Sequence, residues 1–479
     1  MLSIIYINED DRRREYCSFK ALRDCGLDRF FDESVCKILI KDCSVSCIEK
    51  RNEFFSAMSD SGFLGHLETF EKKLSYSLEA FDSYSDSSCK AEEFFCFFQY
   101  LQAYSEMIEV AEAKYENDFW KNVSVWAKNE KNRLERVGEK IARYREIVES
   151  ISSFCIKLYN GQLYISKKHP QKTLYDKLED VFSDIGYRVK KQGALHIRLS
   201  KIFSDAFCQV FANETSELSA LMGEIKACMD TEYFNLKEEL DYYFSVYRFF
   251  SEIKKSGLPV CFASNAGTPS YRAKNMWDPL LFNRSENIVD NDVCLDGSES
   301  FFLLAGANGG GKTTYARSLI SNLIFFKAGC PILASNAAIY PFRSIYTVFP
   351  SEAANEGSRF EIELKEINET IDNMPQYSFI VLNESFSTTN VDIAKATALN
   401  TVEKLNGKKA FGLFVTHFHE LTEKVPTLSV VIDEAAENRR TFKVVKNKRS
   451  KSSFAEDILK KYKMDKMGLL ERKAGYGLK

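Results

Sequence analysis

Residues 301–314 read FFLLAGANGGGKTT, an apolar run that breaks into a glycine-rich turn and continues as the start of a helix. The turn has the spacing G-x-x-x-x-G-K-[ST] of a phosphate-binding loop, in the strand-to-helix context that such a loop requires. Glycines are needed because side chains would keep the backbone N–H groups from surrounding phosphate oxygens, to which the helix adds its positive N-terminal dipole. The stretch therefore predicts a nucleotide-binding α/β domain, and a glycine turn without a ligand is the alternative.

Candidate nucleotide-binding residues follow from this loop. Lys312 is expected to reach the β- and γ-phosphates, and the Thr313 hydroxyl is expected to bind Mg²⁺. ATP or GTP with Mg²⁺ is thus the predicted cofactor. The residues assigned to the nucleotide here are Gly306, Ala307, Asn308, Gly309, Gly310, Gly311, Lys312, Thr313 and Thr314.

Length and composition set limits on the rest of the chain. Its 479 residues predict two to four compact units, and the net charge of -3 with a pI near 6.1 predicts no global field for nucleic acid. Any DNA contact must then come from local basic patches. Thirteen cysteines without a C-x-x-C pair, no leading signal segment and no long apolar run predict a cytoplasmic protein with reduced thiols.

The first hundred residues have the pattern of packed helices. After a short predicted strand over residues 2–7, the chain is rich in Leu, Phe and charged residues and poor in Gly and Pro. One helix is expected to begin near Cys47. Another is expected to bury a stripe formed by Phe63, Leu64, Leu67, Phe70 and Leu74.

Two heptad patterns follow. Leu134, Ile141 and Val148 recur every seven residues, and a second pattern runs farther along the chain. Its members are Met222, Met229, Leu236, Tyr243 and Phe250. These patterns predict two long helices that pack against each other as an antiparallel arm.

A small β-containing knob is expected between these helices, at about 154–199. Apolar alternation on both sides of Asn160-Gly161 is a strong hairpin signal. Basic side chains with interspersed tyrosines gather in the same segment, as in a surface that binds a phosphate backbone. The candidates for DNA binding are Lys167, Lys168, Lys190 and Lys191, and a merely solvated face is the alternative reading.

From Ser256 onward the pattern is that of a doubly wound α/β domain. Buried strands are expected over residues 379–382 and 413–415, separated by a helix that begins at Asn390 and ends at Gly407. A further helix should follow Gly357. The chain thus divides into residues 1–118 with a helical core, 119–255 with the arm and its knob, and 256–479 with the nucleotide-binding domain.

Polar side chains follow the two predicted strands at their carboxyl ends, where ligands of such sheets bind. Glu384 suits a general base that polarises the attacking water, and Asn383 stands where an Asp usually helps to hold Mg²⁺. His417 is placed to approach the γ-phosphate. The alternatives are an ordinary turn at Asn383-Glu384 and a metal site involving His417 and His419, for which no third ligand is evident.

Taken together, these motifs resemble the MutS family of DNA-repair ATPases over residues 287–459. The loop 306–314 resembles that family's phosphate-binding loop, 384–389 the stretch after its acidic strand, and 416–421 its His-containing switch. Residues 357–360 with Glu363 resemble the segment that offers a serine, here Ser358, to the nucleotide of the partner subunit. Residues 451–455 resemble the start of its C-terminal dimerisation helices.

The resemblance implies an ATP-dependent DNA-binding homodimer, located in the cytoplasm at the nucleoid, with core, lever and clamp elements before the ATPase domain. Asn291 would contact the base. Fewer than about fifty residues precede the helical core, which implies a short form without the mismatch-binding and connector domains. Its expected substrate is duplex or branched DNA. Two alternatives stay open: a nucleotide-gated DNA-binding protein with little hydrolysis, and another coiled-coil ABC-type ATPase for chromosome maintenance.

Overall fold

The computed structural model divides the chain into two compact units. We call Met1–Ile4 with Ser56–Leu240 the helical unit, and Ile5–Phe55 with Asp241–Lys479 the sheet unit. Among the residues described, no helix is long and apolar enough to cross a membrane. The described ranges are 2–152, 154–159, 162–167, 201–285, 287–297, 299–306, 309–350, 356–386, 390–416, 425–433 and 439–446.

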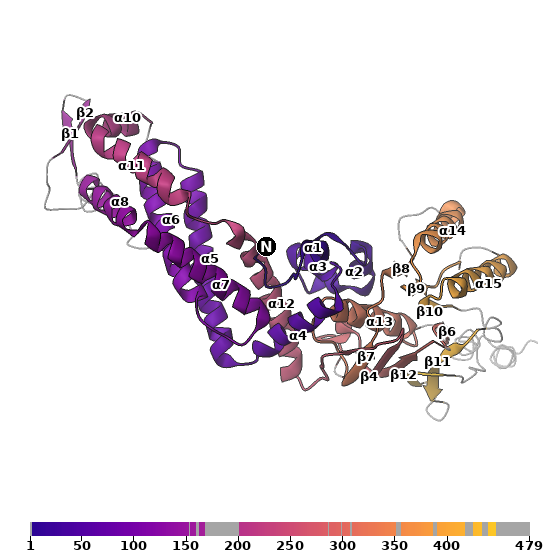
Figure 1. Cartoon of the computed structure of the whole chain (residues 1–479). Helices are drawn as coiled ribbons and strands as arrows, with labels where there is room; N and C mark the ends of the chain where they lie inside the picture. The colour runs from indigo at the N-terminus through magenta and orange to yellow at the C-terminus, as the bar shows by residue number, and fades with distance from the viewer. Residues whose placement is uncertain are drawn as a thin grey trace, which may run out of the picture. The chain divides into compact units, whose positions relative to one another are not determined.

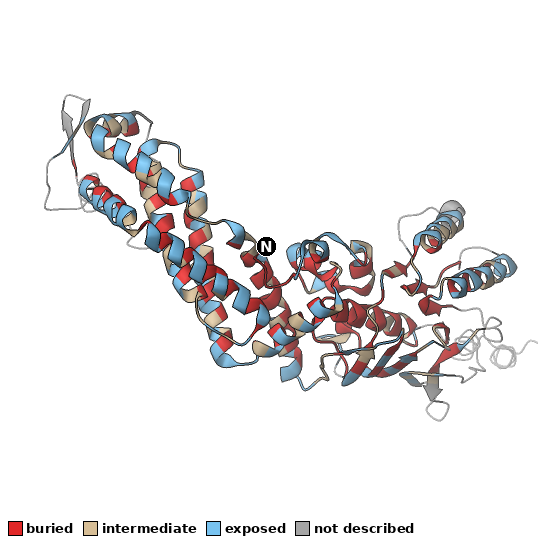
Figure 2. Cartoon of the chain, viewed as in Figure 1, coloured by how far each residue is buried: buried red, intermediate tan, exposed pale blue. Residues whose placement is uncertain are grey.

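The helical unit is built around two long helices, α5 and α6, that pack side by side (Figures 1 and 2). Phe63, Leu67, Phe70 and Leu74 are buried along α5, which confirms most of the predicted stripe, and Leu64 lies at its half-buried edge. The elements of this unit are α5 Ser61–Ser85, α6 Lys90–Ala111, α7 Asp118–Arg136, α8 Gly138–Ile151, β1 Cys155–Tyr159, β2 Gln162–Ser166, α10 Lys201–Val210, α11 Ala212–Lys226 and η2 Glu232–Asn235. Helix α12, Leu236–Lys255, begins here and continues into the sheet unit.

Each of the two predicted long helices is interrupted, so the expectation of continuous helices was wrong. The first ends as α7 and restarts as α8 at Val137, where a β-branched residue precedes Gly138 and both disfavour helix. The second breaks between α11 and α12. There the side chain of Asp230 accepts a hydrogen bond from the N–H of Glu232, which gives the backbone a local partner outside the helix.

The antiparallel packing of the predicted arm holds between α8 and α11. Lys140 pairs with Glu224, and the Nε of Arg143 lies 2.7 Å from a carboxylate oxygen of Glu217, so the pairs run in opposite directions along the chain. The predicted hairpin is also present, because β1 and β2 pair antiparallel. Its Asn160-Gly161 turn and most of the knob lie outside the described residues.

The sheet unit contains a six-stranded and a four-stranded sheet, both mixed. The six-stranded sheet has the order β12-β11-β6-β10-β9-β8, in which only β12 runs antiparallel to its neighbour. The four-stranded sheet has the order β3-β7-β4-β5. The strands are β3 Ser264–Asn265, β4 Tyr271–Met276, β5 Asn291–Leu295, β6 Phe301–Ala305, β7 Asn336–Ile339, β8 Ile345–Val348, β9 Phe379–Asn383, β10 Phe411–Val415, β11 Thr427–Asp433 and β12 Arg439–Lys446.

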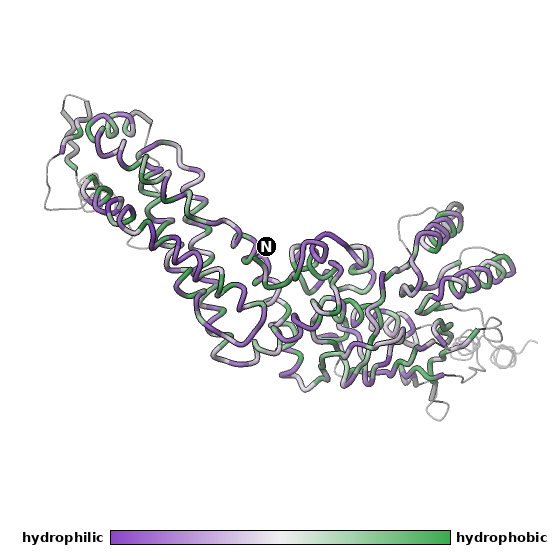
Figure 3. The backbone as a smooth tube through the Cα atoms, in the orientation of Figure 1, coloured by the Kyte–Doolittle hydropathy of each residue, from purple (hydrophilic) through white to green (hydrophobic). Residues whose placement is uncertain are grey.

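Helices cover both faces of the six-stranded sheet. Helices α14 and α15 pack on one face through a core that includes Ile367, Ala398 and Phe414, and α13 packs on β9 and β10. The central strands β6, β9 and β10 are buried along their length and are mostly apolar, because both their faces are covered; the polar Asn383 ends β9 (Figure 3). The helices are α1 Glu9–Arg13, α2 Phe19–Cys25, η1 Leu27–Arg29, α3 Glu33–Leu39, α4 Val45–Ala57, η3 Pro279–Leu281, α13 Lys312–Lys327, α14 Glu356–Asn373 and α15 Val391–Gly407.

The predicted strand over residues 2–7 is absent, which corrects the sequence prediction. In place of a neighbouring strand, the N–H of Ile4 finds a side-chain partner, an oxygen of the buried Glu239 carboxylate at 2.7 Å. Residues 5–55 also belong with the sheet unit, whereas the sequence grouped them with the helical core. The N–H of Ile345 in β8 donates to the carbonyl of Tyr16 at 2.8 Å, so this segment closes the β8 edge of the sheet.

Candidate nucleotide site

The glycine-rich turn joins β6 to α13. Gly306, Gly309 and Gly311 have φ values of 142°, 68° and 97°, a region that side chains rarely tolerate. Gly311 caps α13, whose first residue is Lys312. Gly310 lies buried between them, whereas Ala307 and Asn308 lie outside the described residues. Gly306, Gly309 and Gly311 therefore adopt backbone angles that favour glycine, and the phosphate-binding role of the turn stays a prediction.

The hairpin of β11 and β12 packs its side chains against the same three glycines. A Cβ added to Gly306 would lie 3.1 Å from Cβ of Val430. One added to Gly309 would lie 2.6 Å from Nη1 of Arg440, and one added to Gly311 would lie 3.3 Å from Cδ1 of Phe442. The backbone angle favours glycine at all three positions, and the hairpin also leaves little room for a side chain at Gly306 and Gly311.

Lys312 is buried and lies over the turn, where its Nζ donates a hydrogen bond to the carbonyl of Gly306 at 2.9 Å. Burial lowers the pKa of this ammonium, and the negative charge of Glu384 opposes that effect. A desolvated cation beside several backbone N–H groups is a suitable partner for phosphate.

The end of β9 lies beside the first turn of α13. The Thr313 hydroxyl donates to Oδ1 of the buried Asn383 at 3.4 Å, so the two predicted metal-binding residues are in contact. Glu384 follows in the left-handed region with φ of 54°, and its N–H donates to Val415 at 2.9 Å. This sharp turn holds the Glu384 side chain at the cavity wall.

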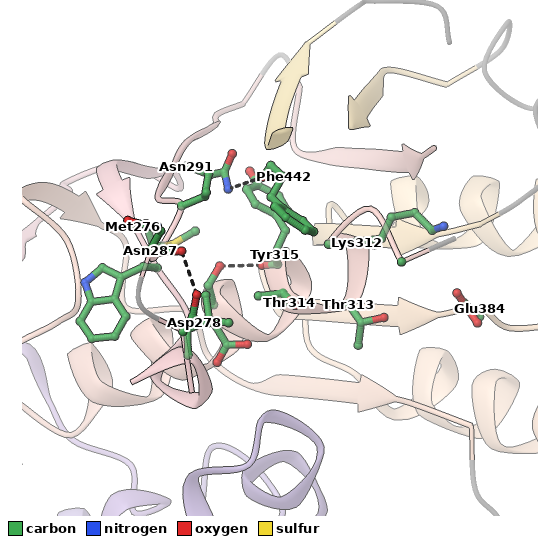
Figure 4. A pocket seen from close by; sticks show the side chains of 17 residues that line it. Met276, Asp278, Asn287, Asn291, Lys312, Thr313, Thr314, Tyr315, Glu384 and Phe442 are labelled. Atoms are coloured by element: carbon green, nitrogen blue, oxygen red, sulfur yellow. Dashed lines mark hydrogen bonds between the residues drawn. The ribbon is translucent and has the colours of Figure 1, made fainter. Parts of the chain in front are cut away.

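A cavity of about 310 Å³ extends from this polar end between α13, η3 and β12. Figure 4 shows Lys312, Thr313 and Glu384 at one end and Met276, Asp278 and Asn287 toward the other. The remaining wall is mostly apolar or aromatic, as in pockets that bury a flat ring. It includes Trp277, Leu281, Val289, Tyr315 and Phe442.

Asn291 lines the cavity, but its amide is engaged with strand β12. Its Nδ2 donates to the carbonyl of Phe442 at 3.1 Å (Figure 4), and its Oδ1 accepts from the N–H of Val444 at 2.7 Å. The side chain therefore replaces a strand pairing between β5 and β12. These two hydrogen bonds hold Phe442 in the cavity wall. They also occupy the Asn291 amide, which the sequence assigned to contact with the base.

Asp278 is a buried carboxyl in the same wall, exposed by 2%. One of its oxygens accepts from the N–H of Leu280 at 2.9 Å and so caps η3. Burial raises the pKa of Asp278 to about 6, against the favourable effect of that N–H and of two arginines. A carboxyl that titrates near neutral pH thus faces the apolar end of the cavity.

Comparison with known proteins identifies the C-terminal part of the chain. The family model described as MutS domain V matches residues 302–470. DNA mismatch repair protein MutS from Oceanobacillus iheyensis is 34% identical over 137 residues, which cover 28% of this chain and 16% of that protein. Residues 302–470 are thus similar to domain V of MutS proteins.

Two further MutS proteins match the chain similarly. The protein from Lactobacillus gasseri is 32% identical over 143 residues, and the one from Fusobacterium nucleatum subsp. nucleatum is 36% identical over 143 residues. These matches cover 29% of this chain in both cases, and 17% and 16% of the relatives. The chain therefore matches less than a fifth of the length of the curated MutS relatives.

Most of the residues predicted at the glycine loop and at the end of β9 lie together in the structure. Thr314 lies in the first turn of α13 and lines the cavity. The turn after Glu384 is held by a hydrogen bond that the N–H of Phe386 donates to Oε2 of Glu363 at 2.9 Å. Ser358 lies in α14, but the structure does not describe its side chain. His417 lies outside the described residues.

The candidate DNA-binding lysines stay predictions. Lys168, Lys190 and Lys191 lie outside the described residues. Lys167 is described, and its Nζ lies 2.6 Å from a carboxylate oxygen of Glu214. Half of its side chain remains exposed, so the ion pair leaves it accessible.

Sequence reasoning did not find Asp278 and Phe442, which line the cavity, or Arg440, which packs against the glycine turn. Arg440 and Phe442 are far from the loop in sequence and belong to no short motif. The sequence could have predicted the hairpin, because residues 427–433 and 439–446, which follow the switch at 416–421, form its two strands. Which side chains of the hairpin face the loop depends on its register, which the pattern did not determine.

Proposed function

We propose that the sheet unit binds ATP with Mg²⁺ and hydrolyses it, and that the chain is a nucleotide-gated dimeric DNA-binding protein of DNA repair or recombination. The observation that carries the proposal is the cavity itself. It joins a glycine cradle at a helix N-terminus, a buried lysine, and a Thr-Asn oxygen pair to an apolar and aromatic pocket. Similarity of residues 302–470 to MutS domain V, which belongs to a family of ATPases, supports the same reading.

The donor set fits both groups. The oxygens of Thr313 and Asn383 are hard ligands of the kind that Mg²⁺ and its waters prefer, and the glycines of the turn put no side chain of their own beside the backbone N–H groups. When bound, the metal would neutralise charge that develops on the phosphates. Lys312 would exchange the carbonyl of Gly306 for a phosphate oxygen, and Phe442 would lie against the base.

Glu384 is the proposed general base. Its carboxylate would accept the proton of the attacking water, and the left-handed turn that follows β9 keeps it at the cavity wall. The loss of a carboxylate at Asn383 weakens the hold on the metal and predicts slow turnover. This substitution is the observation that favours the second candidate, a nucleotide-gated binding protein with little hydrolysis.

The quaternary and DNA-binding parts of the proposal rest on the resemblance of the motifs. Two composite sites, each with one subunit's loop and the other's Ser358 segment, would close on ATP and move the helical units of a homodimer. The lysines of the knob, Lys167, Lys168, Lys190 and Lys191, would contact the phosphate backbone of duplex or branched DNA. An arm tip that dimerises would instead favour another coiled-coil ABC-type ATPase.

Calorimetric titration of Mg-ATP into wild type and Lys312→Ala tests nucleotide binding. We expect the variant to lose measurable affinity, because the main side-chain partner of the β- and γ-phosphates is removed. Lys404→Ala, which removes a lysine bonded to Asn368 on the surface, is the control and should bind normally. Equal affinity in Lys312→Ala would refute the assignment of the loop.

Single-turnover hydrolysis by Glu384→Gln, with and without DNA, separates the two candidate functions. The variant should bind ATP but not cleave it. Binding assays with homoduplex, mismatched, forked and four-way DNA, each with and without ATP, then identify the substrate class. A wild type that turns over no faster than the variant would support the gated binding protein over the ATPase.

A further inference from the structure

Arg51 in α4 is buried in the sheet unit at the C-terminal end of α13, the helix that begins at the glycine turn. Its Nη1 donates to the carbonyl of Ala328 at 3.1 Å, and its Nε donates to the carbonyl of Ile5 at 2.9 Å. Ala328 is the C-cap of α13, whose last carbonyls have no partner within the helix. The Tyr242 hydroxyl donates to the same carbonyl at 2.9 Å. Two side chains therefore hold the end of the nucleotide-site helix.

The environment of Arg51 is unusual for a buried cation. Among the described residues, no carboxylate lies within ion-pair distance of it, and its Nη2 has no hydrogen-bond partner. The rings of Tyr6 and Tyr242 lie 5.3 and 5.9 Å from its guanidinium, and the C-terminal end of α13 attracts positive charge. Burial of a guanidinium is unfavourable, because the charged group loses its hydration. The guanidinium is well suited to hold several backbone segments in one geometry, because it has five N–H donors.

The contacts of Arg51 coincide with the places where the chain passes between its two units. The passages follow Ile4, Phe55 and Leu240. Ile5 begins the sheet unit after the first passage, α4 carries Arg51 toward the second, and Tyr242 follows the third. A single side chain thus contacts or belongs to every segment that leads from the sheet unit to the helical unit.

We propose that Arg51 is a positioning residue that couples the nucleotide site to the helical unit, which rests on the function proposed above. Helix α13 has 16 residues, is buried along its length, and extends for about 24 Å as one rigid element. A shift of its first turn upon phosphate binding would therefore reach Ala328 almost undiminished. There it would displace a carbonyl that Arg51 and Tyr242 hold, and both residues lie on helices that continue into the helical unit.

The close fit at this helix end supports transmission. Gly329 has φ of 71°, and a Cβ added there would lie 2.5 Å from Cβ of Arg51. Helix α4 therefore approaches the end of α13 without an intervening side chain. Packed groups at this distance move together, because interiors do not compress easily.

Lys327 provides a matched control on the same helix end. It is equally buried, with 3% of its side chain exposed, but its Nζ pairs with Asp42 at 2.6 Å and lies over the Tyr16 ring. Neither partner borders a passage between the units. Replacing Lys327 should disturb the sheet unit as much as replacing Arg51 does, without affecting the coupling.

Hydrogen exchange of the full chain, with and without Mg-ATP, tests the proposal in wild type, Arg51→Met, Arg51→Lys, Tyr242→Phe and Lys327→Met. In wild type and Lys327→Met, nucleotide should change exchange in peptides from residues 56–240. In Arg51→Met this change should fall at least fivefold while calorimetric ATP affinity stays within threefold. Arg51→Lys should restore part of it, and Tyr242→Phe should reduce it about twofold.

Coupling through Arg51 is overturned if Arg51→Met keeps the full response, or if Lys327→Met loses it to the same extent. Should Arg51→Met fail to fold, an unchanged response in Tyr242→Phe would overturn it equally. A wild type that binds ATP without any response in residues 56–240 also refutes the coupling, and leaves nucleotide binding intact. A wild type that binds no nucleotide refutes the proposed function itself.

Discussion

Replacing Asp278 by Asn should stabilise the sheet unit at neutral pH and lose that effect in acid. The Asp278 carboxyl is almost fully buried, and burial raises its pKa to about 6, above the usual value of 3.8. A raised carboxyl pKa means that the folded state opposes ionisation, so the wild type is relatively more stable below the unfolded pKa and loses that advantage as pH rises through the folded pKa. Asn keeps an oxygen for the N–H of Leu280 and carries no charge.

The size of the effect follows from the difference between the two pKa values. At pH 7.5 the ionised carboxylate costs the folded state about 3 kcal/mol, from roughly 1.4 kcal/mol per unit of pKa. At pH 5 the same linkage leaves about 1.6 kcal/mol, because the folded carboxyl is then largely protonated. The amide group of Asn must also find a partner, which costs about 1 kcal/mol. A net stabilisation of about 2 kcal/mol at pH 7.5 should therefore shrink to less than about 1 kcal/mol at pH 5.

Urea unfolding followed by hydrogen exchange in peptides of α13 measures the stability of the sheet unit at each pH. Asp292→Asn is the control with the opposite sign. Burial raises the pKa of Asp292, but the Lys274 ammonium and the N–H of Asn275 outweigh it and lower that pKa. Its removal should destabilise at pH 7.5, with an effect that disappears as pH falls through the folded pKa. If Asp278→Asn is no more stable than wild type at pH 7.5, the buried charge is fully compensated and the reasoning fails.

Three further outcomes are expected. Gly412→Ala should prevent folding of the sheet unit, because the new Cβ would lie 1.8 Å from the carbonyl oxygen of Ile380, and soluble expression with a native circular dichroism spectrum would contradict this. Asn291→Ala should destabilise by about 1 to 3 kcal/mol and speed hydrogen exchange in β12, because two hydrogen bonds are lost, and unchanged exchange there would refute the role. Asn383→Asp should lower the Mg²⁺ concentration needed for half-maximal ATPase activity, and an equal or higher requirement would show that the site has adapted to Asn383.

The sequence predicted those elements whose causes are local. The glycine turn, the strands β6, β9 and β10, and the helix capped by Asn390 all have signals within a few residues, and the structure has each of them. The hairpin β1–β2 was predictable for the same reason. Buried parallel strands have nearly continuous apolar sequences, so they could be recognised as apolar runs. Caps and turns could be recognised because they restrict the residue type locally.

Elements that depend on distant partners were missed. A heptad pattern persists across Val137, although the helix breaks there, because apolar spacing reports which face is buried and not whether the backbone is continuous. Residues 5–55 were assigned to the wrong neighbours, since their helical pattern does not say which surface covers it. The same limit applies to Arg440 and Phe442, whose place over the glycine turn depends on how the hairpin of β11 and β12 lies on the sheet.

The charged residues at the phosphate end of the cavity indicate what an amide, in place of a carboxylate, changes at position 383. Lys312 lines the cavity, and Arg440 packs against the glycine turn. Among the described residues, Glu384 is the carboxylate that lines this end of the cavity. An Asp at position 383 would add a second carboxylate beside Glu384, and the site would then depend on Mg²⁺ to make room for the charge of the nucleotide. Asn383 adds no charge beside Glu384, so under the proposed function we expect the site to bind nucleotide tightly and to turn it over slowly. A domain of this charge is suited to signal through its loaded state, which is the state that the coupling through Arg51 would report.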